Sequence, residues 1–118
     1  MTEKNLSELK YLLKEIAMYK SRLCDLEAYK KKATDRQKVE IDVLKAKITA
    51  KMTECLALYD KINEFISSIK DSLLRMIISL RFINSLSWEQ IDAHIGGQNT
   101  ADGIRKIYSR YAQRFLRE

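Results

Sequence analysis

Apolar residues recur at alternating intervals of three and four positions along most of the first 70 residues. In residues 2–32 they are Leu6, Leu9, Leu12, Leu13, Ile16, Tyr19, Leu23 and Leu26. In residues 36–70 a heptad pattern, interrupted only by Lys51, consists of Ile41, Leu44, Ile48, Cys55, Leu58, Ile62, Phe65 and Ile69. This spacing is typical of amphipathic helices that pack along one apolar stripe, so we expect two long helices.

The pattern is interrupted between the two stretches. The positions that would be apolar in one continuous helix are polar: Glu27, Lys30, Thr34 and Gln37. Thr34 and Gln37 also have the spacing of a capping box, which favours a new helix start. The sequence therefore predicts an antiparallel helical hairpin over residues 1–70. Because the heptad frame is the same on both sides of the gap, one continuous coiled-coil helix is the alternative.

The last third of the chain predicts shorter helices that follow one another closely. A strongly apolar helix contains Leu73, Leu74, Ile77, Ile78, Leu80 and Phe82, and it ends at the turn-like pair Asn84 and Ser85. Ser87 and Gln90 form a second capping box, which predicts a short helix over residues 88–95. Gly96 and Gly97 then predict a left-handed helix end and a tight turn.

A final helix is expected from residue 100 to about residue 116. Asn99 or Thr100 is its predicted N-cap. Its predicted inward stripe consists of Ile104, Ile107, Tyr108, Tyr111 and Phe115. A short helix, a glycine turn and a second helix with apolar support predict a helix-turn-helix over residues 71–118. The expected fold is thus all-α, with an N-terminal helical hairpin followed by this segment.

Particular residues of this segment resemble a known family. The string LRFINSLSWEQI at residues 80–91, followed by Gly96, Ile104 and Arg110, resembles region four of bacterial RNA polymerase sigma factors. Trp88 and the run from Gly96 to Lys106 resemble small regulators of Gram-positive phages and prophages, of the ArpU or RinA late-transcription type. The specific likeness covers residues 73–116. Since nothing resembles sigma region two, the likeness implies a regulator rather than a complete promoter-opening factor.

Candidate DNA-binding residues lie around the start of the last helix, off its apolar stripe: Asn99, Thr100, Arg105, Lys106, Ser109 and Arg110. We expect Arg105 and Lys106 to reach guanine edges or phosphates. Asn99 and Thr100 are expected to contact the DNA backbone at a helix N-terminus. A solvated terminal helix is the alternative reading, and Arg110 has the further alternative of pairing with an acid inside the domain.

Composition favours some classes of function and argues against metal-binding and enzymatic ones. The 22 Lys and Arg residues against 16 Asp and Glu residues give a net charge of +6, which is compatible with nucleic acid as a partner. One histidine, His94, and two separated cysteines supply no metal site, and no catalytic motif or cofactor-binding loop is present. With a turn near Thr34, Cys24 and Cys55 would lie roughly 16 Å apart, so we expect free thiols.

The sequence favours a cytoplasmic protein with no membrane association, because its N-terminus, MTEKNLSELK, lacks the apolar stretch of a signal peptide. Our first hypothesis is a phage-encoded, sequence-specific transcription regulator that binds double-stranded DNA as a homodimer. Its arm, residues 1–70, would dimerise or dock on RNA polymerase. The second hypothesis is a phage effector that obstructs a host protein or nucleoprotein. Neither hypothesis involves an enzyme or a cofactor.

Overall fold

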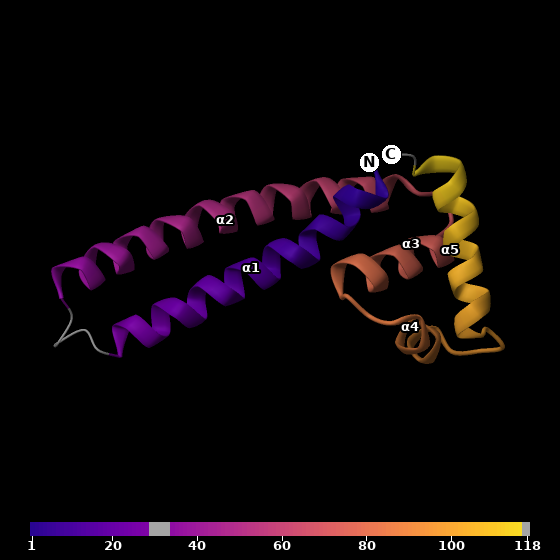
Figure 1. Ribbon diagram of the computed structural model, residues 1–118. Helices are drawn as coiled ribbons and strands as arrows, with labels where there is room; N and C mark the ends of the chain where they lie inside the picture. Colours follow the sequence, from indigo (N-terminus) through magenta and orange to yellow (C-terminus); the bar gives the residue numbers. More distant parts are fainter. Residues whose placement is uncertain (29–33, 117–118) are drawn as a thin grey trace. The chain divides into compact units, whose positions relative to one another are not determined.

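The computed structural model describes residues 1–28 and 34–116, and within these ranges the chain is helical without any strand (Figure 1). Its elements are α1 (Glu3–Glu27), α2 (Asp35–Ser68), α3 (Ser72–Ile78), the π-helical segment η2 (Ser79–Ile83), α4 (Trp88–Ile95) and α5 (Ala101–Phe115). The all-α prediction is confirmed. Over the same ranges, no helix has the length and hydropathy needed to cross a membrane. The chain forms two compact units, one of Met1–Lys10 with the segment from Leu58 onwards, the other of Tyr11–Ala57.

The helix α2 has a start of its own. Its N-terminus is closed by a reciprocal pair of hydrogen bonds, in which the Thr34 amide donates to Gln37 Oε1 at 2.9 Å and the Gln37 amide donates to Thr34 Oγ1 at 3.2 Å. The capping box predicted at these two residues is confirmed. The interruption of the apolar pattern therefore marks a helix boundary, although Lys30, one of its polar positions, lies outside the described residues.

In the unit Tyr11–Ala57, α1 and α2 lie antiparallel. Lys51 Nζ is 3.3 Å from Glu15 Oε1, and Lys45 Nζ is 3.5 Å from Glu27 Oε1. Residue numbers therefore rise along α2 in the direction in which they fall along α1. The buried apolar residues between the two helices are Leu12, Ile16, Ile41, Leu44, Ile48 and Cys55. This arrangement is the antiparallel one that the hairpin hypothesis requires, and the continuous coiled-coil helix is not observed.

Lys51 interrupts the heptad pattern without leaving a charge unpaired. Its ammonium group lies within ion-pair distance of Glu15 and also of Glu54, whose Oε2 is 3.5 Å away. The hydrogen bond and the charge of Glu15, followed by the charge of Glu54, raise the pKa of Lys51. A lysine is tolerated at this core-facing position because both neighbouring carboxylates reach it.

Two apolar positions were assigned to the wrong face. Leu13 is 48% exposed, because the buried row of α1 runs through Leu9, Leu12 and Ile16 at the three-and-four spacing of one helix face. Phe115 is also exposed, and its ring lies 4.9 Å from the ring of Tyr111. In α5 the small residue Ala112 occupies the buried position instead.

The thiols are free, as expected. Cys24 is exposed and Cys55 is buried. Burial raises the pKa of the Cys55 thiol, and the neighbouring charge of Glu54 raises it further. Cys55 therefore serves as a small packing residue of the hairpin.

The unit formed by Met1–Lys10 and the segment from Leu58 onwards is built around a core of completely buried aliphatic side chains: Leu6, Ile62, Ile77, Ile78, Ile91 and Ile104. They come from α1, α2, α3, α4 and α5. The helix α5 packs against both α3 and α4. Asp71 starts α3, since its Oδ1 accepts hydrogen bonds from the amides of Leu73 and Leu74. These contacts give α5 a rigid support.

The helix predicted through Phe82 changes its winding at Ser79. The chain continues as the π-helical segment η2, with the Asn84 amide donating to the carbonyl of Ser79 at 3.2 Å. Ser85 then takes a positive φ of 55°. Arg81 Nη1 donates to the carbonyl of Leu86 at 2.9 Å, which ties the following turn to η2. Because a π-turn is wider than an α-turn, this segment rotates the side chains that follow it relative to α3.

Candidate functional site

The short helix α4 begins at a complete capping box. The Ser87 amide donates to Gln90 Oε1 at 2.8 Å, and the Gln90 amide donates to Ser87 Oγ at 3.2 Å. The predicted helix over residues 88–95 is confirmed with the same bounds. Ile91, three residues into this helix, is fully buried and anchors it to the core.

The turn after α4 depends on glycine. Gly96 has φ 73° and ψ −162°, and Gly97 has φ 75°. The positive φ was expected, but the ψ of Gly96 is extended, so the predicted left-handed helical conformation is wrong at this residue. This region of backbone space is almost restricted to glycine, since a Cβ strains it. Asn99 Nδ2 donates to the carbonyl of Gly96 at 3.2 Å, and this hydrogen bond joins the two ends of the turn.

Thr100 is the N-cap of α5. Its Oγ1 accepts a hydrogen bond from the Gly103 amide at 3.0 Å, whereas the side chain of Asn99 is engaged with the turn. A Cβ at Gly103 would lie 3.0 Å from the same hydroxyl oxygen. The glycine inside this helix therefore makes room for the capping side chain, an explanation that the sequence alone did not supply.

An aromatic cluster supports the inner side of α5. The ring of Tyr108 lies 5.5 Å from the ring of Phe82 and 5.5 Å from that of Trp88. The guanidinium of Arg81 lies over Trp88, 4.4 Å from the ring centre. Trp88 is thus engaged by both η2 and α5.

The hydroxyl of Tyr108 is tied to the start of the chain, because it donates a hydrogen bond to Glu3 Oε1 at 2.9 Å. Burial raises the pKa of Tyr108 far above its usual range, and the hydrogen bond and charge of Glu3 add to this, while the nearby charge of Arg81 lowers it. The phenol is therefore neutral at every physiological pH. Its position fixes the inner face of α5.

On the outer side of α5, Arg105 and Lys106 share one carboxylate. Arg105 Nη2 is 2.8 Å from Asp102 Oδ1, and Lys106 Nζ is 3.0 Å from Asp102 Oδ2. The hydrogen bond from Arg105, then that from Lys106, lowers the pKa of Asp102. All three side chains are about half exposed or more. The (i, i+3) and (i, i+4) spacing of these residues in the sequence is itself a signal for both pairs.

The six predicted site residues divide between the start of α5 and its outer face. Asn99 and Thr100 are exposed at the N-terminus, and Arg105 and Lys106 lie one turn further along. Ser109 is half-buried and Arg110 is exposed. Within the described part of the chain Arg110 forms no ion pair, so the alternative of pairing with an acid inside the domain is not observed. The structure brings Arg105 and Lys106 together around Asp102, and their binding role stays a prediction.

A shallow hollow of about 140 Å³ lies beside this cluster, between the starts of α4 and α5. Trp88, Glu89, Ala101, Asp102 and Arg105 line it. Two carboxylates and one guanidinium give it a mixed charge, so it has no excess positive charge that would hold a free anion.

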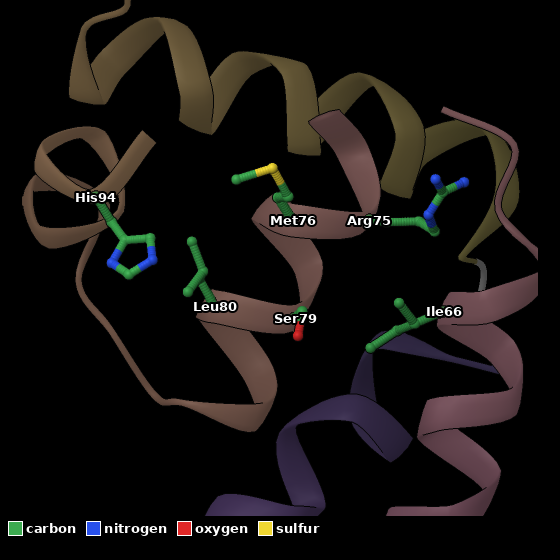
Figure 2. A pocket seen from close by; sticks show the side chains of 6 residues that line it. All are labelled: Ile66, Arg75, Met76, Ser79, Leu80 and His94. Atoms are coloured by element: carbon green, nitrogen blue, oxygen red, sulfur yellow. The ribbon is translucent and has the colours of Figure 1, made fainter. Parts of the chain in front are cut away.

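A larger hollow of about 360 Å³ opens in the same unit, beside α3 and η2 (Figure 2). Its lining consists of Ile66, Arg75, Met76, Ser79, Leu80 and His94. Arg75 is already engaged, since its Nη1 donates to the carbonyls of Ile69 and Lys70, which directly follow α2. The hollow is therefore mainly an apolar surface with one histidine at its edge, and we assign no ligand to it.

Comparison with known proteins does not assign the chain to a family. No protein-family model, no curated protein and no solved structure matches the chain. The resemblance of residues 73–116 to sigma region four therefore remains a prediction.

Proposed function

We propose that the chain is a sequence-specific regulator of transcription that binds double-stranded DNA with the N-terminal half of α5. The observation that carries this proposal is the division of α5 into two faces. Ile104 and Tyr108 are buried against the preceding elements, whereas Arg105 and Lys106 stand exposed one turn after the N-cap. In this proposal α4, the glycine turn and α5 form a helix-turn-helix, with α5 as its recognition helix.

Rigid support of α5 favours this role. Major-groove readout requires side chains that are held in a defined register relative to the DNA backbone. The capping box of α4, the Gly96 turn and the Thr100 cap each restrict the backbone immediately before the proposed contact residues. A surface helix without these restraints would lose more conformational entropy on binding.

Five of the six candidate residues have a proposed contact. Arg105 reads guanine through its planar guanidinium, which can donate two parallel hydrogen bonds to N7 and O6. Lys106 contacts a phosphate as a point charge, and Arg110 contacts the backbone further along the groove. Asn99 and Thr100 lie where the exposed amides of a helix start favour a phosphate, and Ser109 lies one turn beyond Arg105.

Asp102 moderates the positive charge of this face. Its carboxylate neutralises one of the two cationic charges it contacts, so the three side chains together carry one positive charge. It also holds Arg105 and Lys106 in place before DNA arrives. We therefore expect modest non-specific affinity, and the proposed specificity depends on direct contacts with bases.

The remaining part of the proposal concerns the assembly. A single small helix-turn-helix buries too little surface for tight specific binding, so two copies on a twofold-related site are expected. The helical arm would supply the dimer contact or a docking surface for RNA polymerase. The resemblance to small phage regulators suggests a phage-encoded protein that acts in the bacterial cytoplasm.

Selection from a random-sequence DNA library at near-physiological salt tests the proposal. An enriched motif, especially an inverted repeat, supports a sequence-specific regulator. A salt series on the enriched site should show a linear fall of log affinity with log salt concentration. If only weak binding without a motif is found, the regulator proposal fails. The protein-binding effector then becomes the better hypothesis.

A further inference from the structure

The last turn of α5 carries an aromatic pair that lies outside the buried core. Phe115 is 58% exposed, and its ring centre lies 4.9 Å from that of Tyr111, one turn earlier in the helix. The guanidinium of Arg114 lies over the Phe115 ring, 5.3 Å from its centre. We call Tyr111, Phe115 and Arg114 the aromatic–arginine stack. All three residues belong to the unit that contains the whole of α5.

The stack places a cation without neutralising it. A guanidinium within about 6 Å of a ring centre is attracted by the electrons of the ring and keeps its full charge. Arg105 and Lys106 differ in this respect, because both are ion-paired with Asp102. Among the described residues, no carboxylate lies within ion-pair distance of Arg114. The Phe115 ring therefore favours one placement of the guanidinium and leaves its positive charge in place.

Arg114 also continues a basic row along the outer side of α5. Lys106, Arg110 and Arg114 follow one another at intervals of four residues, and all three are exposed. Four residues of an α-helix rise about 6 Å and turn about 40° beyond a full turn. The three side chains therefore start from a line of about 12 Å that winds slightly around the helix. Asp102 is the only acidic residue of α5, and it lies before this row.

A row of cations fits a chain of phosphates better than it fits one small anion. Cations that bind a compact anion converge on one point, whereas these three are spread along the helix axis. Each strand of duplex DNA presents one phosphate for about every 3.4 Å of its axis, so a line of this length faces several of them. Arginine suits such a contact, because its guanidinium can donate two parallel hydrogen bonds to phosphate oxygens.

We infer that Arg114, held by Phe115 and Tyr111, binds a phosphate of duplex DNA and extends the contacts of Lys106 and Arg110 to the end of α5. The contact does not depend on base sequence, because a phosphate carries no sequence information. The inference rests on the proposed function for its choice of DNA as the partner. Its test uses a duplex without the selected motif, whereas the proposed function is tested by the selection, so the two can fail separately.

A salt series by fluorescence anisotropy on the motif-free duplex tests the phosphate contact. Arg114→Gln should reduce the slope of log affinity against log salt concentration by about one. Its binding should be roughly tenfold weaker at about 50 mM salt and roughly fourfold weaker at about 200 mM. Arg114→Lys should keep the wild-type slope, since the charge remains. Arg22→Gln, at an exposed arginine of α1, is the matched control and should keep it too.

The same assay tests the role of the ring. Phe115→Leu keeps an apolar side chain and removes the ring beneath Arg114, so binding should weaken about two- to fivefold. The double variant Phe115→Leu with Arg114→Gln should bind as Arg114→Gln does, because the ring acts through the guanidinium. Tyr11→Leu is the matched control, at an exposed ring whose centre lies 5.9 Å from Lys14 Nζ on α1. Circular dichroism checks that all variants remain helical.

Four outcomes would overturn the inference. They are a wild-type chain without salt-dependent binding, an unchanged slope in Arg114→Gln, additive losses in the double variant, and competition by poly-glutamate as strong as that by duplex DNA. An arginine that only stabilises the C-terminus of α5 through the helix dipole would change unfolding and leave the slope unchanged. If the expected effects appear but selection enriches no motif, the phosphate contact stands and the sequence-specific regulator is rejected.

Discussion

The phenol of Tyr108 donates a hydrogen bond to Glu3 Oε1 at 2.9 Å and so joins α5 to the first turn of α1 across 105 positions of sequence. Tyr108 is 4% exposed, and its ring also contacts Phe82 and Trp88. The inner face of the proposed recognition helix is therefore held by the opening residues of the chain as well as by the elements that precede it.

Replacing Tyr108 with Phe should lower the free energy of unfolding by about 1 kcal/mol, because the ring packing is kept while the hydrogen bond is lost. Urea unfolding followed by circular dichroism measures this change. Tyr111→Phe is the matched control, since no hydrogen bond of the Tyr111 hydroxyl is found among the described residues. Equal losses in the two variants would show that the contact with Glu3 contributes nothing.

The same phenol predicts how stability changes in alkaline solution. The pKa of Tyr108 is raised in the folded state, mainly by burial, so the folded chain retains a proton that the unfolded chain releases. Its contribution is therefore complete below the unfolded pKa of about 10 and is lost as the pH rises above that value. Burial also raises the pKa of Tyr111 and Cys55, which add to the fall.

Unfolding measured between about pH 8 and pH 11 tests this prediction. The wild-type free energy of unfolding should decrease above about pH 10, and Tyr108→Phe should show a shallower decrease. The remaining slope in the variant belongs to the other raised groups. Identical slopes for the two proteins would rule out Tyr108 as a source of the alkaline instability.

Gly96→Ala should destabilise the chain by about 1–3 kcal/mol, because its backbone conformation is nearly restricted to glycine. No heavy atom lies within 4 Å of a Cβ at this position, so the effect is conformational and not steric crowding by neighbours. Thermal and urea unfolding provide the measurement. Gly103→Ala, at a glycine in ordinary helical conformation, should change stability less, as helix propensity and the contact with Thr100 oppose one another. A Gly96→Ala protein as stable as the wild type would contradict this account of the turn.

Arg105→Ala and Lys106→Ala should affect DNA binding differently. Loss of a guanine contact at Arg105 should cost about 1–3 kcal/mol and relax the preference at one base pair. Loss of a phosphate contact at Lys106 should weaken all sequences alike and reduce the salt slope by about one. Fluorescence anisotropy on the selected site measures both effects. Arg22→Ala, at an exposed arginine of α1, serves as the control, and equal effects at all three positions would remove Arg105 and Lys106 from the site.

Asp102→Asn should strengthen non-specific DNA binding and steepen its salt dependence, since the variant removes the carboxylate that pairs with Arg105 and Lys106. The measurement is a salt series on a duplex without the selected motif. Asp25→Asn, an exposed change of the same kind on α1, controls for net charge. Unchanged non-specific binding in Asp102→Asn would mean that the two cations do not face the DNA.

Several features were readable from the sequence because they depend on neighbouring residues. The capping boxes at Thr34 with Gln37 and at Ser87 with Gln90 involve residues three positions apart. The positive φ of Gly96 follows from the end of α4 just before it. The pairs of Asp102 with Arg105 and Lys106 belong to the same class, since helix spacing alone brings them together.

Other features depend on which surfaces meet, and only the tertiary structure decided them. Leu12 and Leu13 are both leucines beside the same stripe, but only Leu12 is buried, because α2 covers one side of α1. In α5, Ala112 is buried and Phe115, which was expected on the buried face, is exposed. Here too the packing partner decides which side chain is covered. The contact of Tyr108 with Glu3 and the π-helical winding of η2 likewise arise from packing. A local hydrogen-bond pattern is encoded within a few residues, whereas the choice between adjacent apolar side chains depends on the partner surface that folding brings against them.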